Sequence, residues 1–147
     1  MALTRREFLM SLSILFATPA RALPAVRSGS FQLKVFQGFR FDDGSIGKSG
    51  SEMDLSFFYQ MRRFGMISFL GASHIARFDE RPAQGSITVA EVQAWDDSVA
   101  GPSPGYYALQ ARNGGKYYLL HLEKFENQGK AASYWLMSFS WEEFQVH

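Results

Sequence analysis

Histidines are the residues of this sequence best suited to hold a ligand, and there are three of them: His74, His121 and His147. Two facing histidines, or a histidine and a methionine thioether, can bind haem iron from opposite sides. His74 and His121 fall in stretches that we expect to be strands, so both are candidate ligand-binding residues. Isolated histidines on the polar face of a sheet would give the same pattern. Covalent haem attachment is excluded, because no C-x-x-C-H motif is present.

Aromatic residues form the second group that could bind a ligand. Rings on an exposed sheet face can stack on a sugar, a haem or a protein partner. For this reason Tyr117 is a third candidate ligand-binding residue. The alternative is that both faces of the sheet are buried, as in a sandwich. The aromatic residues in question are Tyr106, Tyr117, Tyr134, Trp135, Trp141 and Phe144.

Known motifs of catalysis and metal binding are missing from the sequence. It contains no cysteine, which excludes disulfides, thiolate metal sites and a cysteine nucleophile. It also lacks the G-x-S-x-G, P-loop, G-x-G-x-x-G and H-E-x-x-H motifs. We therefore predict no catalytic residue, no metal site and no cofactor, with haem as the alternative.

Carboxylates occur as four adjacent pairs, at Asp42-Asp43, Asp79-Glu80, Asp96-Asp97 and Glu142-Glu143. Neighbouring residues of a strand point to opposite faces, so such a pair does not by itself form an acid–base couple. The sequence around Asp42 also lacks the ligand spacing of a calcium-binding loop. We interpret these pairs as turn and capping residues.

The first 22 residues read as an export signal. Arg5 and Arg6 lie in a stretch that resembles the twin-arginine export motif, and Phe8–Ala17 is a short apolar segment. That segment is about half of the ~20 residues that span a bilayer. Small residues flank Arg21, so we expect cleavage after Ala22 and a periplasmic or secreted protein without a stable membrane anchor. The alternative is an uncleaved anchor.

The rest of the chain has the length and composition of one folded domain. It is 46% hydrophobic and 16% aromatic over 147 residues, which argues against disorder. Without residues 1–22 it keeps 12 basic and 13 acidic residues. A nearly neutral domain is a poor candidate for sequence-independent binding to nucleic acid or to an anionic membrane. We expect an unknown small ligand or a protein as its partner.

Hydrophobic periodicity predicts a β-rich domain over residues 31–147, after a flexible lead-in at 23–30. Phe31, Leu33 and Val35 alternate with polar residues, as in a half-buried strand. Thr88 and Glu91 have capping-box spacing, which predicts a short helix. We expect strands at 30–41, 53–60, 64–70 and 72–78, turns at 42–51, the helix at 88–95 and irregular chain at 99–105.

The stretch Tyr106–Phe144 is predicted to be a three-stranded antiparallel meander. Asn113-Gly114 between two aromatic-rich runs is a strong hairpin signal, because a type I′ turn needs positive φ at both central residues. A two-residue loop would pair Arg112 with Gly115. One face would then carry alternate residues such as Tyr107, Leu109, Tyr118 and Leu120, and the other His121. We expect Leu120 and Leu136 in the core.

The order of several short motifs resembles the HmuY-like group of exported bacterial β-rich domains. They are Gly38–Gly44, Asp54–Phe57, Tyr106–Arg112 and Asn113–Tyr118. The resemblance would cover residues 31–144, and it implies a sandwich-like fold and, in some members, haem held between two axial side chains. Those members are typically lipoproteins, whereas this chain has no cysteine. Their ligand histidines cannot be aligned onto His74 or His121.

Together these features predict a mainly β, antiparallel, β-sandwich-like single domain with one short helix and a C-terminal three-stranded meander. The function that we expect is that of an exported, non-catalytic domain that binds a ligand or a protein partner at an aromatic-rich face. A haem-binding or haem-carrier protein of HmuY-like type is the alternative, and a small exported hydrolase is the third.

Overall fold

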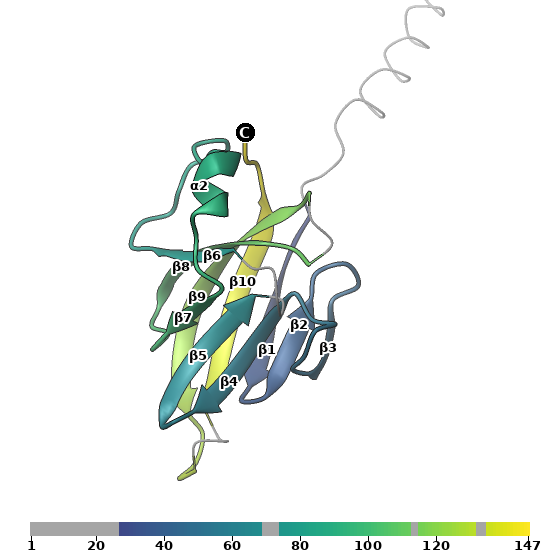
Figure 1. Ribbon diagram of the computed structural model, residues 1–147. Helices are drawn as coiled ribbons and strands as arrows, with labels where there is room; N and C mark the ends of the chain where they lie inside the picture. The colour runs from purple at the N-terminus through teal and green to yellow at the C-terminus, as the bar shows by residue number, and fades with distance from the viewer. Residues whose placement is uncertain (1–26, 69–73, 113–114, 132–134) are drawn as a thin grey trace, which may run out of the picture.

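The computed structural model describes residues 27–68, 74–112, 115–131 and 135–147. Over these residues the chain forms two antiparallel five-stranded sheets and one short helix (Figure 1). The predicted mainly β, sandwich-like fold is therefore confirmed. The export signal at residues 1–22 and its cleavage site lie outside the described residues, as do parts of the predicted strands at 64–70 and 72–78.

The two sheets lie face to face around one core that both supply. Sheet A has the strand order β1 (Ser28–Lys34), β10 (Trp135–Phe144), β9 (Tyr117–Asn127), β8 (Gly105–Gln110) and β6 (Ile75–Phe78). Sheet B has the order β3 (Ser45–Lys48), β2 (Gln37–Arg40), β4 (Leu55–Gln60), β5 (Arg63–Ser68) and β7 (Ser98–Ala100).

The C-terminal meander has the predicted strands and the predicted register. β8, β9 and β10 are neighbours in sheet A, and Leu109 pairs with Tyr118 and Tyr107 with Leu120. This is the register that a two-residue loop between Arg112 and Gly115 requires. Tyr107, Leu109, Tyr118 and Leu120 are all fully buried, as predicted. The Asn113-Gly114 turn itself lies outside the described residues.

Leu136 does not belong to the core, which corrects our prediction. The register between β9 and β10 shifts at Ser138/Phe139, so that one extra residue of β9 is left opposite β10. The shift allows Leu122 and Phe125, three residues apart, both to pack in the core. Met137 is then the inward-facing residue, and Leu136 pairs with Glu126 while remaining half-buried.

The predicted single strand over residues 30–41 is in fact two strands in different sheets. The chain turns at Val35–Phe36, where Phe36 has a φ of 67°, and passes from β1 in sheet A to β2 in sheet B. The period-two pattern of buried residues continues after the turn, since Leu33, Phe39 and Phe41 are all buried. Both sheets face the same core, so the same apolar alternation runs through both strands and does not reveal the turn between them.

Three further predictions about local structure are wrong for related reasons. Residues 28–30 of the predicted lead-in belong to β1, where a Cβ on Gly29 would lie 2.9 Å from Trp141 Nε1. Glycine there permits close packing rather than flexibility. β3 lies within the predicted turn at 42–51, and β7 overlaps the predicted irregular segment 99–105. Both are short edge strands whose hydrogen-bonded neighbours outweigh weak local propensity.

The one described helix, α2 (Val89–Gln93), confirms the capping-box prediction. The Thr88 side chain accepts a hydrogen bond from the Glu91 N–H, and the Glu91 carboxylate accepts one from the Thr88 N–H. Val92 is buried with Ile87 against the outer face of sheet A, where it meets Ala108 and other residues of a second, smaller core. The helix thus covers part of the sheet face that points away from sheet B.

Asp54 joins the two sheets at one end of the sandwich. It is buried, and its two carboxylate oxygens accept hydrogen bonds from the N–H groups of Phe41 at 2.8 Å and Arg112 at 2.9 Å. Phe41 follows β2 and Arg112 follows β8, so one side chain satisfies backbone donors from both sheets. A buried carboxylate is tolerated only when it is satisfied in this way.

Candidate functional site

The candidate site is a cleft on the outer face of sheet A, beside the part that α2 covers. It has a volume of about 110 Å³. The residues come from four strands of the sheet, β1, β8, β9 and β10, and from the loop before the helix. They are Ser28, Arg81, Tyr106, Leu119, His121, Ser140, Trp141 and Glu142.

Tyr106 and His121 form the aromatic part of the cleft. They are directly paired across β8 and β9, and their rings stack at a centroid distance of 4.5 Å with an interplanar angle of 11°. Directly opposed residues on one sheet face have their Cβ atoms about 5 Å apart, which suits ring stacking. His121 remains partly exposed, as its place on the outer face predicted.

The polar part of the cleft comes from β1, β10 and Arg81. Ser140 pairs with His121 across the strands, and Ser28 pairs with Glu142. The Arg81 guanidinium donates a hydrogen bond to the Glu142 carboxylate and forms an ion pair with it. The cleft therefore offers an aromatic surface, two serine hydroxyl groups and one cation–anion pair within a small space.

Of the adjacent carboxylate pairs, Asp42-Asp43 has the turn role that we predicted, whereas Glu142 and Glu143 lie within β10 and form ion pairs, which corrects our interpretation of them as turn or capping residues. Glu142 pairs with Arg81, whereas Glu143 pairs with Arg27, so the two neighbours have different partners. Asp43 accepts a hydrogen bond from the Ser45 N–H in the turn before β3. Hydrogen bonds from Ser45 hold the pKa of the Asp43 carboxyl below its ordinary value.

The three candidate ligand residues lie on one face of sheet A but do not meet at one site. His121 lines the cleft, while Tyr117 lines a separate depression with Lys116 and Gln145. His74 precedes β6, and its backbone carbonyl accepts a hydrogen bond from the Gln110 N–H. Its buried Nδ1 has no hydrogen-bond partner among the described residues.

His74 and His121 are far apart for a shared ligand. Ile75 and Leu120 point into the core, so the preceding and following histidines point to the outer face. His74 lies beside Gln110 and His121 beside Tyr106, which places them on opposite sides of β8 and four residues apart along it. Strand geometry gives a separation of roughly 16 Å between their Cα atoms.

The aromatic residues that we expected on a single face are divided between two. Trp135 and Trp141 pack against the main core, whereas Phe144, Tyr106 and Tyr117 belong to the second core on the outer face. Tyr134 lies outside the described residues. Most of these rings are thus used in packing, and Tyr106 is the one that reaches the cleft with a histidine partner.

Arg81, Ser28 and Ser140 were missed by the sequence reasoning. The polar alternation of Ser138, Ser140 and Glu142 along β10 was a signal, because it marks an outward face. Nothing in the sequence placed Arg81 beside that face, since it lies 61 residues from Glu142 along the chain.

Over residues 27–68, 74–112, 115–131 and 135–147, no group of three or more His, Cys, Asp or Glu side chains is placed to hold a metal ion. None of the described helices has the length and apolar character that a membrane span requires. No protein-family model, curated protein or solved structure matches the chain.

Proposed function

We propose that this chain is an exported, non-catalytic β-sandwich domain that binds a ligand or protein partner through the Tyr106–His121 cleft. The stacked ring pair beside the Arg81–Glu142 ion pair is the observation that carries this proposal. Exposed rings with nearby hydrogen-bonding groups are the composition of binding sites for sugars and protein side chains.

The size of the cleft suggests what it receives. Its volume of about 110 Å³ is below the roughly 300–1,000 Å³ of sites that enclose a complete small-molecule ligand. A single ring or side chain fits such a space. We therefore infer that the cleft receives one group of a larger molecule, either a glycan or a protein, whose remaining contacts lie outside it.

A hydrolase is less well supported by the same residues. Nucleophilic catalysis requires a serine hydrogen-bonded to a histidine that a carboxylate orients. Ser140 pairs with His121 across the strands, but no hydrogen bond joins their side chains among the described contacts. Glu142 is bound to Arg81 rather than to His121.

Saturation-transfer NMR tests the cleft with two probe sets, methyl pyranosides and N-acetyl-tryptophanamide. We expect transfer to one of the two sets, its loss in His121→Ala and its retention in Tyr117→Ala. Tyr117 is a suitable control because it is a half-buried ring on the same face outside the cleft. Absence of transfer to both sets, or equal loss in the two variants, would overturn the proposal. Melting curves verify that each variant is folded.

Haem remains the alternative that the HmuY-like resemblance implies. His121 is the one histidine that lines the cleft, so haem there would have His121 and a second ligand other than His74. Haem titration with detection of a Soret band distinguishes the two proposals. A band that His121→Ala abolishes and His74→Ala leaves intact would favour a haem carrier over a ring-binding domain.

Export by the twin-arginine route is the second part of the proposal. The paired arginines are the recognised feature, so Arg5→Lys combined with Arg6→Lys should leave uncleaved precursor in the cytoplasm. Fractionation followed by mass determination of the N-terminus measures this. Normal secretion of the double variant would refute the route without affecting the cleft.

A further inference from the structure

Charge is distributed unevenly along the sandwich. One end carries the β1–β2 turn, the β4–β5 turn and the end of β9; we call it the Met61 end (Figure 1). Exposed basic residues outnumber acidic ones there by six to two. The basic residues are Lys34, Lys48, Arg62, Arg63, Lys124 and Lys130, and the acidic ones are Glu123 and Glu126.

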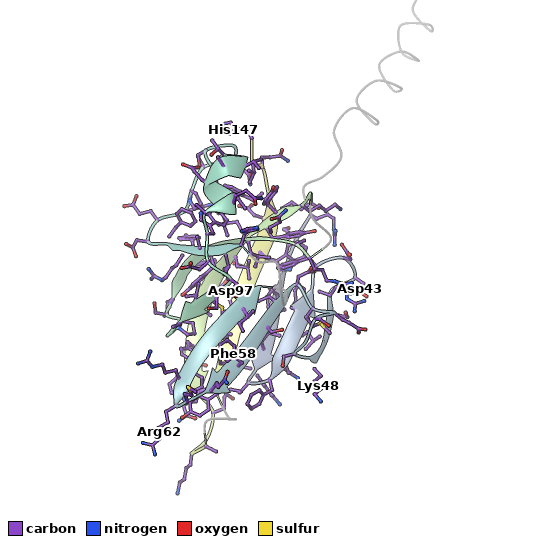
Figure 2. All side chains as sticks on the ribbon, viewed as in Figure 1. Asp43, Lys48, Phe58, Arg62, Asp97 and His147 are labelled. Atoms are coloured by element: carbon purple, nitrogen blue, oxygen red, sulfur yellow. The ribbon has the colours of Figure 1, made fainter. Side chains whose placement is uncertain are left out.

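The ion pairs of the domain are found elsewhere. Arg27, Arg40, Arg77 and Arg81 form all five ion pairs among the described residues, and none of the six basic residues of the Met61 end takes part. Figure 2 shows Arg62 projecting from the Met61 end, with Asp43 toward the opposite end. The domain is therefore nearly neutral in total, although its positive and negative charges are unevenly distributed over its surface.

The tip of the Met61 end exposes apolar side chains in an unfavourable backbone conformation. Met61 and Arg62 form the two-residue β4–β5 turn with φ values of 52° and 62°, and Phe36 in the β1–β2 turn has a φ of 67°. Met61 is 87% exposed and Phe36 53% exposed. Non-glycine residues in this region are uncommon, and such strain concentrates at functional positions.

A shallow apolar depression adjoins the tip. It has a volume of about 170 Å³ and lies beside Met61 and Arg63. Phe58, Phe64 and Val99 contribute apolar parts of its lining. The tip thus combines a projecting methionine, nearby apolar surface and a surrounding group of cations that have no ion-pair partner among the described residues.

We propose that the Met61 end docks the domain reversibly on a bilayer surface that contains anionic phospholipids. Basic side chains near such a surface each strengthen binding, and apolar side chains can enter the boundary between headgroups and acyl chains. The six basic residues supply the electrostatic attraction, and Met61 and Phe36 supply the inserting groups. The arrangement favours a membrane over single-stranded nucleic acid, which would require a groove with several stacking rings.

The orientation keeps the candidate site accessible. Ser28 and Glu142 of the cleft lie where β1 begins and β10 approaches its end, which is the opposite end of sheet A from Lys34 and Asn127. A domain docked by its Met61 end would hold the cleft away from the bilayer. Membrane docking does not depend on what the cleft binds, so the two proposals can fail separately.

The absence of cysteine permits a site-specific test in the full chain. Met61→Cys and, as a control, Asp43→Cys are each labelled with an environment-sensitive dye. Vesicles contain phosphatidylcholine alone or with about one third phosphatidylglycerol. We expect dye fluorescence at position 61 to at least double with the anionic vesicles and to stay constant at position 43. Because the readout is local, binding by the apolar N-terminal segment alone does not produce this pattern.

Matched charge reversals identify the cause. Arg62→Glu, in the Met61→Cys background, should weaken vesicle binding about tenfold or more. Lys116→Glu makes the same charge change before β9, at the opposite end, and should leave binding unchanged. High salt should weaken binding because it screens the attraction. A constant signal at position 61, an equal response at position 43, equal effects of the two reversals, or a response to an oligonucleotide but not to vesicles would each overturn the proposal.

Discussion

The charged groups at the two ends of the sandwich differ in whether they have partners. At the Asp54 end, where β4 begins, a buried carboxylate accepts two backbone hydrogen bonds and Arg27 and Arg40 form ion pairs. At the Met61 end, where β4 finishes, the cations have no ion-pair partner among the described residues and the turn is strained. One end contains a buried carboxylate that stabilises the fold, whereas the other exposes cations without an ion-pair partner among the described residues and has non-glycine residues at positive φ.

The largest difference in stability is expected between truncations of two leucines. Leu120 lies in the core, whereas Leu136 is half-buried at the Met61 end. Leu120 is fully buried, so Leu120→Ala should lower the free energy of unfolding by about 2–5 kcal/mol. Leu136 is half-buried and pairs with Lys34 and Glu126, so Leu136→Ala should cost about 1 kcal/mol or less. Chemical denaturation measures both. Similar losses in the two variants would show that the outward position of Leu136 is wrong.

Removal of the Asp54 carboxylate should have the next largest effect. Asp54→Ala leaves the N–H groups of Phe41 and Arg112 without acceptors, and we expect a loss of about 3 kcal/mol. Asp42→Ala is the matched control, because Asp42 is exposed at the same end. Its effect should be about 0.5 kcal/mol or less. Equal effects in denaturant titrations would contradict the role assigned to Asp54.

Relief of strain in the β4–β5 turn should stabilise the protein. Met61→Asn with Arg62→Gly supplies the residues that a type I′ turn prefers and should raise the free energy of unfolding by about 1–2 kcal/mol. The same variant should bind anionic vesicles more weakly, since the apolar tip and one cation are removed. Met61→Ala with Arg62→Ala is the control: it removes the same side chains without relieving the strain. A stability gain in the control would show that backbone strain is not the cause.

The smallest effect is expected at Tyr118, whose hydroxyl group is buried without a hydrogen-bond partner among the described residues. Tyr118→Phe should change stability at neutral pH by about 1 kcal/mol or less, in the stabilising direction. Burial raises the pKa of the Tyr118 phenol. The unfolded tyrosine therefore ionises first, and the folded wild type loses stability as the pH rises through the ordinary value of about 10.

The Tyr118→Phe variant lacks this ionisation, so its advantage over the wild type should grow with pH. Melting temperatures of the two proteins between about pH 8 and pH 11 measure the difference. A difference that stays constant across this range would contradict the raised pKa.

The sequence alone determined the parts of the fold that depend on local and periodic signals. The period-two pattern predicted the β class, Thr88 and Glu91 predicted the helix, and the loop length at Asn113-Gly114 predicted the register of the meander. These signals are reliable because turn geometry and one buried face fix a hairpin register without help from distant residues.

Only the tertiary structure decided where the chain changes sheets, which faces are covered and which charges gather. The turn at Phe36 is concealed because both sheets bury the same alternate residues. The cleft depends on the contact between Arg81 and Glu142, which lie 61 residues apart in the sequence, and the Met61 end depends on two turns and the end of β9 lying at one end of the sandwich. Net charge and residue spacing do not predict such contacts between residues distant in sequence, because only the packed topology brings those residues together.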